Sequence, residues 1–212
     1  MIFKNRTDAG KKLAQILKKY ANTDALIMAI PRGGVVVGYE IAKELHLPME
    51  IIVPRKIGAP MQPEFAIGAV AGSDVSIIND QAVQALGVPQ SYIIEEAKRQ
   101  RQEIIRREQV YHTGRERISP EGKTVILVDD GIATGYTMIA SARVLRRMNP
   151  ALLIIAVPVA PPDSVGLLKR EADEVVVIDT PEPFHAVGAW YEIFDQTTDE
   201  EVIDLMRRLP GG

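Results

Sequence analysis

Residues 125–137 constrain the fold of this chain more than any other segment. They read V-I-L-V-D-D-G-I-A-T-G-Y-T. The four apolar residues, three of them β-branched, predict a short buried strand that ends on Asp129 and Asp130. A turn of small and hydroxylated residues follows, and apolar residues at helical spacing then begin a helix. This order brings free backbone N–H groups and the positive end of a helix dipole into one small volume.

Such a volume suits a phosphate group. The two adjacent carboxylates repel a phosphate, and they suit hydroxyl groups or a divalent cation on the same ligand. A ligand with a phosphate beside vicinal hydroxyls is a ribose 5-phosphate. A strand followed by two acids also opens the receiver domains that are phosphorylated on aspartate. That reading needs a separate acceptor aspartate on a neighbouring strand end, and no convincing candidate follows residues 51–53.

The segment resembles the signature of type I phosphoribosyltransferases, which is an apolar strand, two acids, a small-residue loop and Thr-Gly-x-Thr. The resemblance implies that Asp129 and Asp130 hold the ribose hydroxyls of phosphoribosyl pyrophosphate (PRPP) and face Mg²⁺, directly or indirectly. It also assigns the 5′-phosphate to the loop residues Gly131, Ile132, Ala133, Thr134, Gly135 and Thr137.

Other motifs extend the resemblance over most of the chain. They are P-R-G-G-V-V-V at 31–37, R-K-I-G-A-P at 55–60, P-E-F-A-I-G-A-V at 63–70 and F-H-A-V-G-A-W-Y at 184–191. Together they resemble stand-alone phosphoribosyltransferases whose acceptor is unassigned.

The loop after the strand at 25–30 carries Arg32, Gly33 and Gly34. Two glycines let the backbone approach a ligand closely, and the planar guanidinium of Arg32 suits phosphate oxygens. In the family, the equivalent loop binds pyrophosphate and often contains a non-proline cis peptide. The resemblance implies a cis peptide within residues 32–34.

Arg55 and Lys56 follow a strand at 50–54, and glycine and proline then interrupt any periodicity. We expect a flexible loop that closes over a polyanion, as in the family, with both cations binding PRPP. Residues 65–70 return as an apolar run, which predicts a hairpin.

Aromatic residues gather near the C-terminal end of a chain that is 5% aromatic. The resemblance implies a hood that binds the acceptor base, with Phe184, His185, Trp190 and Tyr191 as candidates, although core packing is an equal alternative. In the hypoxanthine–guanine members, an aspartate precedes the Thr-Gly of the phosphate loop. Here that position is Ala133, which argues against 6-oxopurine specificity of that kind.

The activity implied by the resemblance is Mg²⁺-dependent phosphoribosyl transfer from PRPP to a nitrogenous base, with release of pyrophosphate. The catalytic candidates are Arg32, Lys56, Asp129 and Asp130. The alternative is a PRPP-sensing regulatory module that binds RNA, DNA or protein. The two cations favour catalysis, because a sensor has no leaving group to stabilise.

Bulk properties limit the partners. A net charge of −3 and a pI near 5.7 make nucleic acid an unlikely partner. The chain has no cysteine, no apolar run of membrane-spanning length and no signal-peptide core at its N-terminus. We expect a cytoplasmic protein that contacts no membrane and forms a homodimer or a higher homo-oligomer.

Apolar runs alternate with helical patterns, which predicts an α/β fold with a mainly parallel sheet flanked by helices. Strands are predicted at 25–30, 50–54, 75–78, 124–128, 151–157 and 174–178, and helices at 8–20, 34–46, 80–86, 91–112, 136–148, 161–171 and 199–209. We expect one domain, 1–212, with a small hood from the N-terminal residues and about 180–195. The charged segment 91–117 reads as a solvated helix, a dimer contact or an anion-binding face, with Glu95–Arg99 and Glu103–Arg107 pairs.

Overall fold

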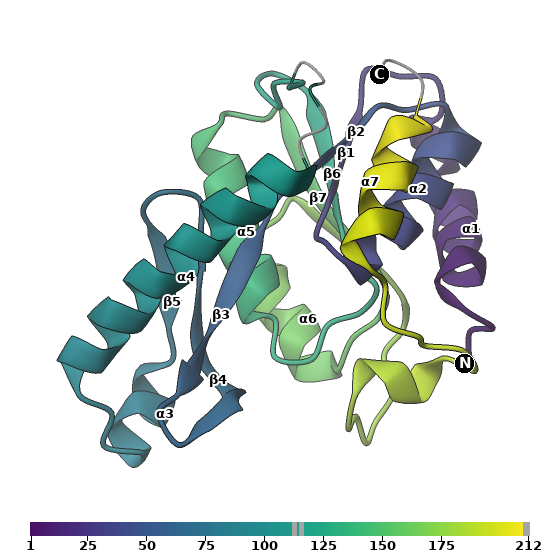
Figure 1. Ribbon diagram of the computed structural model, residues 1–212. Coiled ribbons are helices and arrows are strands. Elements are labelled where there is room, and N and C mark those ends of the chain that lie inside the picture. Colours follow the sequence, from purple (N-terminus) through teal and green to yellow (C-terminus); the bar gives the residue numbers. More distant parts are fainter. Residues whose placement is uncertain (112–113, 115–116, 210–212) are drawn as a thin grey trace.

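The computed structural model describes residues 1–111, 114 and 117–209, apart from the side chain of Glu64. A five-stranded parallel sheet with the order β2-β1-β6-β7-β8 lies at its centre (Figure 1). Its strands are β1 (Leu26–Ala29), β2 (Met49–Ile51), β6 (Thr124–Val128), β7 (Leu152–Val159) and β8 (Glu174–Asp179). The predicted parallel sheet is therefore confirmed.

Helices cover both faces of this sheet because its strands alternate their side chains between two apolar layers. Ile27 and Ala29 pack with α1 (Arg6–Ile16), α2 (Gly33–Leu45) and α7 (Asp199–Arg207). Leu26 and Met28 point to the other face and pack with α5 (Tyr136–Arg147) and α6 (Pro162–Leu168). Two short 3₁₀ helices, η1 (Lys18–Tyr20) and η2 (Val187–Trp190), complete the connections.

A second sheet lies beside the first and is antiparallel. It contains β3 (Pro54–Ala59), β4 (Gln62–Ala71) and β5 (Val75–Ile78). The hairpin predicted around 65–70 is confirmed, but the expected loop at 55–60 is a strand, and the strand at 75–78 does not join the parallel sheet. Glycine and proline are uncommon in strands, so the sequence did not predict β3. Its pairing with β4 is irregular at Gly58.

Two helices, α3 (Asp80–Ala85) and α4 (Gln90–Tyr111), follow the antiparallel sheet. Figure 1 shows the three strands and α4 extending together away from the central sheet. The predicted Glu103–Arg107 pair is present at 2.8 Å, whereas Arg99 pairs with Glu96 at 2.7 Å and not with Glu95. Residues three positions apart are also neighbours on a helix, so Arg99 can pair with Glu96 instead of Glu95. Of the predicted charged segment 91–117, residues 112, 113, 115 and 116 lie outside the described part.

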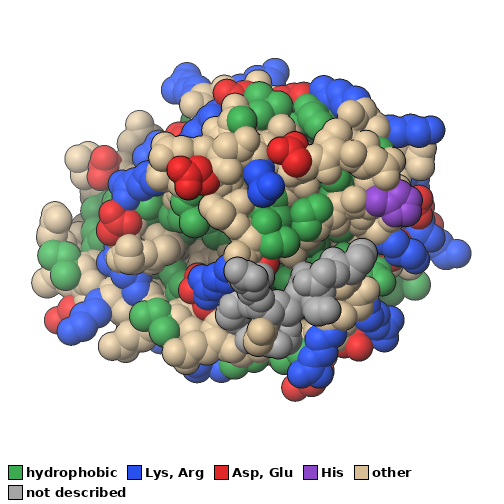
Figure 2. Space-filling view, turned by 90° about the horizontal axis from the view of Figure 1, so that it is seen from above, with side chains coloured by type: hydrophobic (Ala, Val, Ile, Leu, Met, Phe, Trp, Pro, Cys, Tyr) green, Lys and Arg blue, Asp and Glu red, His purple; other side chains and the backbone are tan. Residues whose placement is uncertain are grey.

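The molecular surface mixes both signs of charge. Figure 2 shows basic and acidic side chains interspersed over the face seen from above. No helix in the described part of the chain is long and apolar enough to cross a membrane.

The parallel register brings the two signature loops together. Ala29 at the end of β1 is aligned with Val128 at the end of β6, and Ile30 donates its backbone N–H to the Val128 carbonyl at 2.9 Å. The loop that carries Arg32 and the loop that carries the two acids therefore leave the same edge of the sheet side by side.

Candidate active site

The phosphate-loop candidate joins β6 to α5 and lines a cavity of about 450 Å³. Gly135, with φ +81°, immediately precedes α5 and has a conformation that favours glycine. The Ser164 hydroxyl donates to the Ala133 carbonyl at 2.7 Å, and the Ile132 N–H donates to the Val159 carbonyl at 2.9 Å. The loop is thus held open from two neighbouring elements. The cavity is lined by Lys56, Phe65, Ala66, Asn79, Asp129, Gly131, Ile132, Ala133, Thr134, Gly135, Tyr136, Thr137 and Val187.

The two acids at the end of β6 are placed differently. Asp129 reaches the cavity, and its Oδ1 accepts the backbone N–H of Asp130 at 2.8 Å. Burial raises the pKa of Asp129 well above its usual value, and the adjacent charge of Asp130 raises it further. Burial also raises the pKa of Asp130, although Arg6 opposes this shift. Burial therefore disfavours the charged forms of both carboxylates.

Arg6 is a site residue that the sequence analysis missed. Its Nε donates to Oδ2 of Asp130 at 2.7 Å, and its Nη1 donates to the Asp195 carbonyl at 2.7 Å. The guanidinium also lies over the Phe194 ring, with Cζ 3.8 Å from the ring centroid. An arginine in the first turn of α1 gives no local signal of a partner 124 positions away.

The loop after β1 touches the acid pair directly. A Cβ atom on Gly33 would lie 1.9 Å from Oδ2 of Asp130, and one on Gly34 would lie 2.9 Å from the Cα of Asp129. Only glycine fits this close approach. The cis peptide expected within residues 32–34 is found one position earlier, between Pro31 and Arg32. Nη1 of Arg32 lies 3.7 Å from Oδ1 of Asp199, at the start of α7.

Asp199 also connects this loop to α4. The Tyr111 hydroxyl donates to Oδ1 of Asp199 at 2.6 Å, and burial together with this hydrogen bond raises the pKa of Tyr111 to about 12. One carboxylate thus contacts both Arg32 and the end of α4. Nothing in the local sequence around 199 indicated this role.

Arg55 and Lys56 point to opposite faces of β3, as successive strand residues do. Lys56 lines the cavity of the phosphate loop, together with Phe65 of β4. Arg55 donates through Nε to Oε1 of Gln100 in α4 at 2.8 Å and lies among charged residues of that helix. The structure therefore brings Lys56, and not Arg55, to the phosphate loop.

Three of the four acceptor candidates, Phe184, Trp190 and Tyr191, belong to one apolar cluster, and Tyr191 contacts the acid pair. Tyr191 is buried, contacts Phe3 and Phe194 at centroid distances of 5.5 and 4.9 Å, and donates its hydroxyl to the Asp130 carbonyl at 2.5 Å. Phe184 stacks on Trp190 at 6.2 Å, and His185 is exposed. A β-bridge joins Phe3 to Tyr191. Phe3 of the N-terminal residues thus lies beside the segment 180–195, and a hood formed by these two segments stays a prediction.

Comparison with known proteins decides the family. The family model described as "Phosphoribosyl transferase domain" matches residues 2–192. This chain belongs to the phosphoribosyl transferase family.

Three similar proteins add to this result. "Putative phosphoribosyl transferase Rv0571c" of Mycobacterium tuberculosis is 39% identical over 207 residues, which are 98% of this chain and 47% of the relative. The chain thus spans about half the length of the curated relatives it matches. The crystal structure of TT1426 from Thermus thermophilus is similar with a TM-score of 0.81 and 39% identity, covering 100% of both chains. Protein AQ2163 of Aquifex aeolicus shares the fold at a TM-score of 0.50 and 12% identity, over 86% of this chain and 78% of that one.

Within this family fold, the donors available to a metal ion are few. The described residues contain no group of three or more His, Cys, Asp or Glu side chains that could hold a metal by themselves. Asp129 and Asp130 offer carboxylate oxygens next to the phosphate-loop cavity. This donor set fits Mg²⁺, which proteins often hold through one or two carboxylates together with substrate phosphates.

Proposed function

We propose that this chain transfers the phosphoribosyl group of PRPP to a nitrogenous base and releases pyrophosphate, in a reaction that depends on Mg²⁺. The observation that carries this proposal is the direct contact between Gly33 and the Asp130 carboxylate, next to the phosphate loop. The two loops leave one edge of the parallel sheet side by side, and Lys56 of β3 lines the same cavity as Asp129.

Each part of PRPP has a place in this arrangement. The 5′-phosphate would accept hydrogen bonds from the backbone between Gly131 and Thr137, at the N-terminus of α5. The ribose hydroxyls would donate to Asp129 and Asp130. The pyrophosphate would lie along the Gly33–Gly34 backbone, between the cations of Arg32 and Lys56.

The chemistry follows from this placement. The C1′–O bond to pyrophosphate breaks, its electron pair leaves with the pyrophosphate, and the acceptor nitrogen forms the new bond to C1′. Positive charge develops on the ribose beside the two carboxylates, while negative charge grows beside Arg32 and Lys56. Fixed charges and positioning supply the catalysis, and no covalent enzyme intermediate is required.

Asp129 and Asp130 would help to hold Mg²⁺ against the ribose hydroxyls and the pyrophosphate. The bound ion supplies charge neutralisation of the leaving group. The protein keeps the two carboxylates oriented through the backbone N–H of Asp130 and through Arg6.

For the acceptor base we propose the side of the site covered by the hood, with Phe184, His185, Trp190 and Tyr191 as candidate contacts. Tyr191 is anchored on Asp130, so most of its ring serves packing, and the partly buried Phe184–Trp190 stack and the exposed His185 offer more surface. Ala133 leaves the phosphate loop without an acid to handle a purine proton.

A screen of purine, pyrimidine and related bases for pyrophosphate release from PRPP tests this proposal. We expect release with Mg²⁺ and one class of base, and no release by Asp129→Asn/Asp130→Asn. Tight PRPP binding without release for any base would favour a PRPP-sensing module instead. Lys56 lines the same cavity as Asp129, and a cation there that acts on the leaving group supports catalysis, because a sensor needs none.

A further inference from the structure

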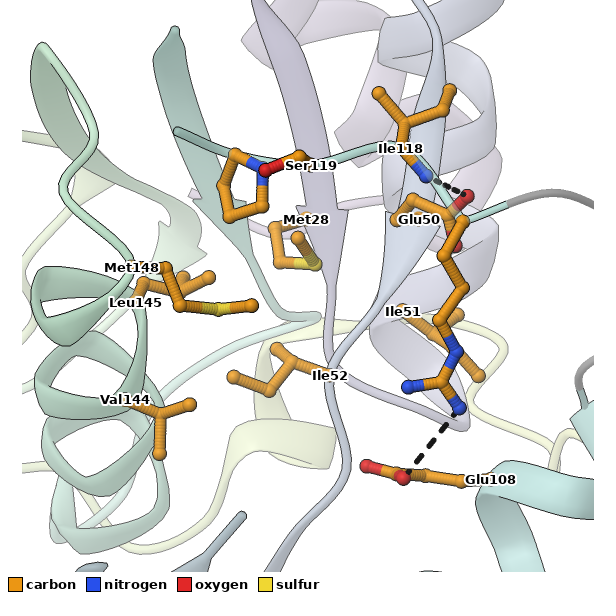
Figure 3. Close-up of a pocket in the computed structure, with 12 residues that line it drawn as sticks. Met28, Glu50, Ile51, Ile52, Glu108, Ile118, Ser119, Val144, Leu145 and Met148 are labelled. Atoms are coloured by element: carbon orange, nitrogen blue, oxygen red, sulfur yellow. Dashed lines mark hydrogen bonds and ion pairs between the residues drawn. The ribbon is translucent and has the colours of Figure 1, made fainter. Parts of the chain in front are cut away.

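A second cavity, of about 320 Å³, lies between α5, the strands β1 and β2, and residues 117–120 (Figure 3). It is separate from the phosphate loop. That loop leads into the first turn of α5, whereas Leu145 and Met148 near the end of the helix line this cavity. Leu145 is nine positions after Tyr136 in the helix, which corresponds to a rise of about 13 Å.

The walls of the cavity are largely apolar. Figure 3 shows Val144, Leu145 and Met148 of the α5 segment facing Met28 and Ile52 across the open space. An apolar cavity of about 150 Å³ is enough to bind benzene. This cavity therefore has room for a ring with a short side chain.

One buried carboxylate breaks the apolar wall. Glu50 is 7% exposed and accepts the backbone N–H of Ile118 through Oε1 at 3.2 Å. Among the described residues, this N–H is its one hydrogen-bond partner, and no described cation forms an ion pair with it. A buried carboxylate without a counter-charge is costly. A cationic ligand would supply the missing charge.

The arginine that lines this cavity already has another partner. Arg117 lines the cavity, but its Nη2 lies 3.7 Å from Oε2 of Glu108 in α4, and its side chain is 61% exposed. Among the described residues, two carboxylates and one guanidinium thus line the cavity. From this charge balance and the apolar walls, we propose that the cavity binds a small, largely apolar molecule that carries one cationic group.

The position of the cavity gives such a ligand a regulatory effect. Ile51 and Ile52 lead out of the parallel sheet into β3, and residues 117–120 lead back from α4 to β6. Both connections to the antiparallel sheet therefore line the cavity. A ligand that contacts both connections would act on the unit that carries Lys56, and this coupling rests on the PRPP site proposed above.

Calorimetric titration with 2-phenylethylamine and with its neutral analogue 2-phenylethanol tests the charge selectivity. We expect saturable binding of the amine to the wild type, at least tenfold tighter than binding of the alcohol. Glu50→Gln preserves the shape and removes the charge, so it should lose this preference and keep the weak alcohol binding. Equal affinities for both probes, or an amine affinity unchanged in a folded Glu50→Gln protein, would overturn the proposal.

Methyl NMR on the wild type locates the probe independently of any variant. The amine should shift the methyl signals of Met28 and Met148, while Met61, which is 91% exposed at the β3–β4 turn, serves as the control. Saturation with PRPP should then change the amine affinity by at least threefold. Unmoved Met28 and Met148 signals would refute the site, and an amine affinity independent of PRPP would refute the coupling.

Discussion

Arg6 and Asp130 are 124 positions apart in the sequence and form a nearly buried ion pair, with Nε and Oδ2 separated by 2.7 Å. The side chains are only 12% and 16% exposed. This pair connects α1 to the end of β6 and fixes the carboxylate that we propose to bind the ribose hydroxyls. The N-terminal segment is therefore part of the site, although the signature motif lies elsewhere.

Replacing Arg6 should damage both stability and PRPP binding. Arg6→Gln leaves two buried carboxylates without their cation, and removing one member of a buried pair costs about 3–5 kcal/mol of unfolding free energy. Chemical denaturation measures this loss. In the same assay, the double variant Arg6→Gln/Asp130→Asn should recover most of the lost unfolding free energy, because the Asp130 charge that Arg6 balanced is also removed. Lys12→Gln, which breaks the partly exposed i,i+4 pair with Asp8, should cost no more than about 0.5 kcal/mol. Losses of equal size in the single and double variants would contradict the assigned role.

Gly33→Ala should abolish PRPP binding while the rest of the fold persists. The new Cβ would lie 1.9 Å from Oδ2 of Asp130 and 2.7 Å from Nε of Arg6, so the carboxylate must move. Gly166→Ala is the matched control, because its Cβ meets nothing within 4 Å and glycine in an exposed helix is unfavourable by up to about 1 kcal/mol. Calorimetry should find no PRPP binding by the first variant and unchanged binding by the second. Wild-type affinity in Gly33→Ala would show that the two loops do not act together.

Asp129→Asn should stabilise the ligand-free protein at neutral pH. Burial, followed by the charge of Asp130, raises the pKa of Asp129 above its usual 3.8, so the folded state holds this proton to a higher pH than the unfolded state. Unfolding free energy then falls as pH rises above about 4, and the asparagine variant avoids this loss. Thermal melts without ligand should show a higher Tm for the variant at neutral pH and convergence near pH 3.5–4. A variant that is less stable at every pH would contradict this account of the acid pair.

Arg32→Ala and Lys56→Ala should each lower kcat/KM for PRPP by about 10²-fold, the scale for removal of one preorganised group at a developing charge. In the proposed mechanism their charges act on pyrophosphate, so the affinity for ribose 5-phosphate should hardly change. Arg143→Ala, in a surface pair with Glu171, is the control for loss of an arginine. If either site variant weakened ribose 5-phosphate as strongly as PRPP, its loop would not be the pyrophosphate loop.

The features that the sequence predicted are local ones. The β6 run, the two acids and the small-residue turn occupy consecutive positions, and the parallel strands read as continuous apolar runs. These signals place Asp129 and Gly33 just after the ends of two parallel strands, whereas Lys56, expected in a loop, lies in strand β3. They also explain why the family resemblance could be found on short motifs.

The features that the sequence missed depend on long-range pairing. The ion pair between Arg6 and Asp130 and the contacts of Asp199 join distant segments through side chains, and no periodicity encodes them. Strand β3 could not be predicted from its own residues because its extended conformation depends on pairing with β4. The side chains of Arg55 and Lys56 point to opposite faces because they are successive residues of this strand. The homo-oligomer expected from the sequence stays a prediction.

Titration of PRPP into the wild type and into Asp129→Asn/Asp130→Asn, with Mg²⁺ present, tests the central claim most directly. Both substitutions preserve shape and remove the two charges that we propose to face the ribose hydroxyls and the metal ion. We predict that the double variant remains folded and binds PRPP at least tenfold more weakly, a difference of about 1.4 kcal/mol or more. An unchanged PRPP affinity in a folded double variant would contradict the assignment of this site.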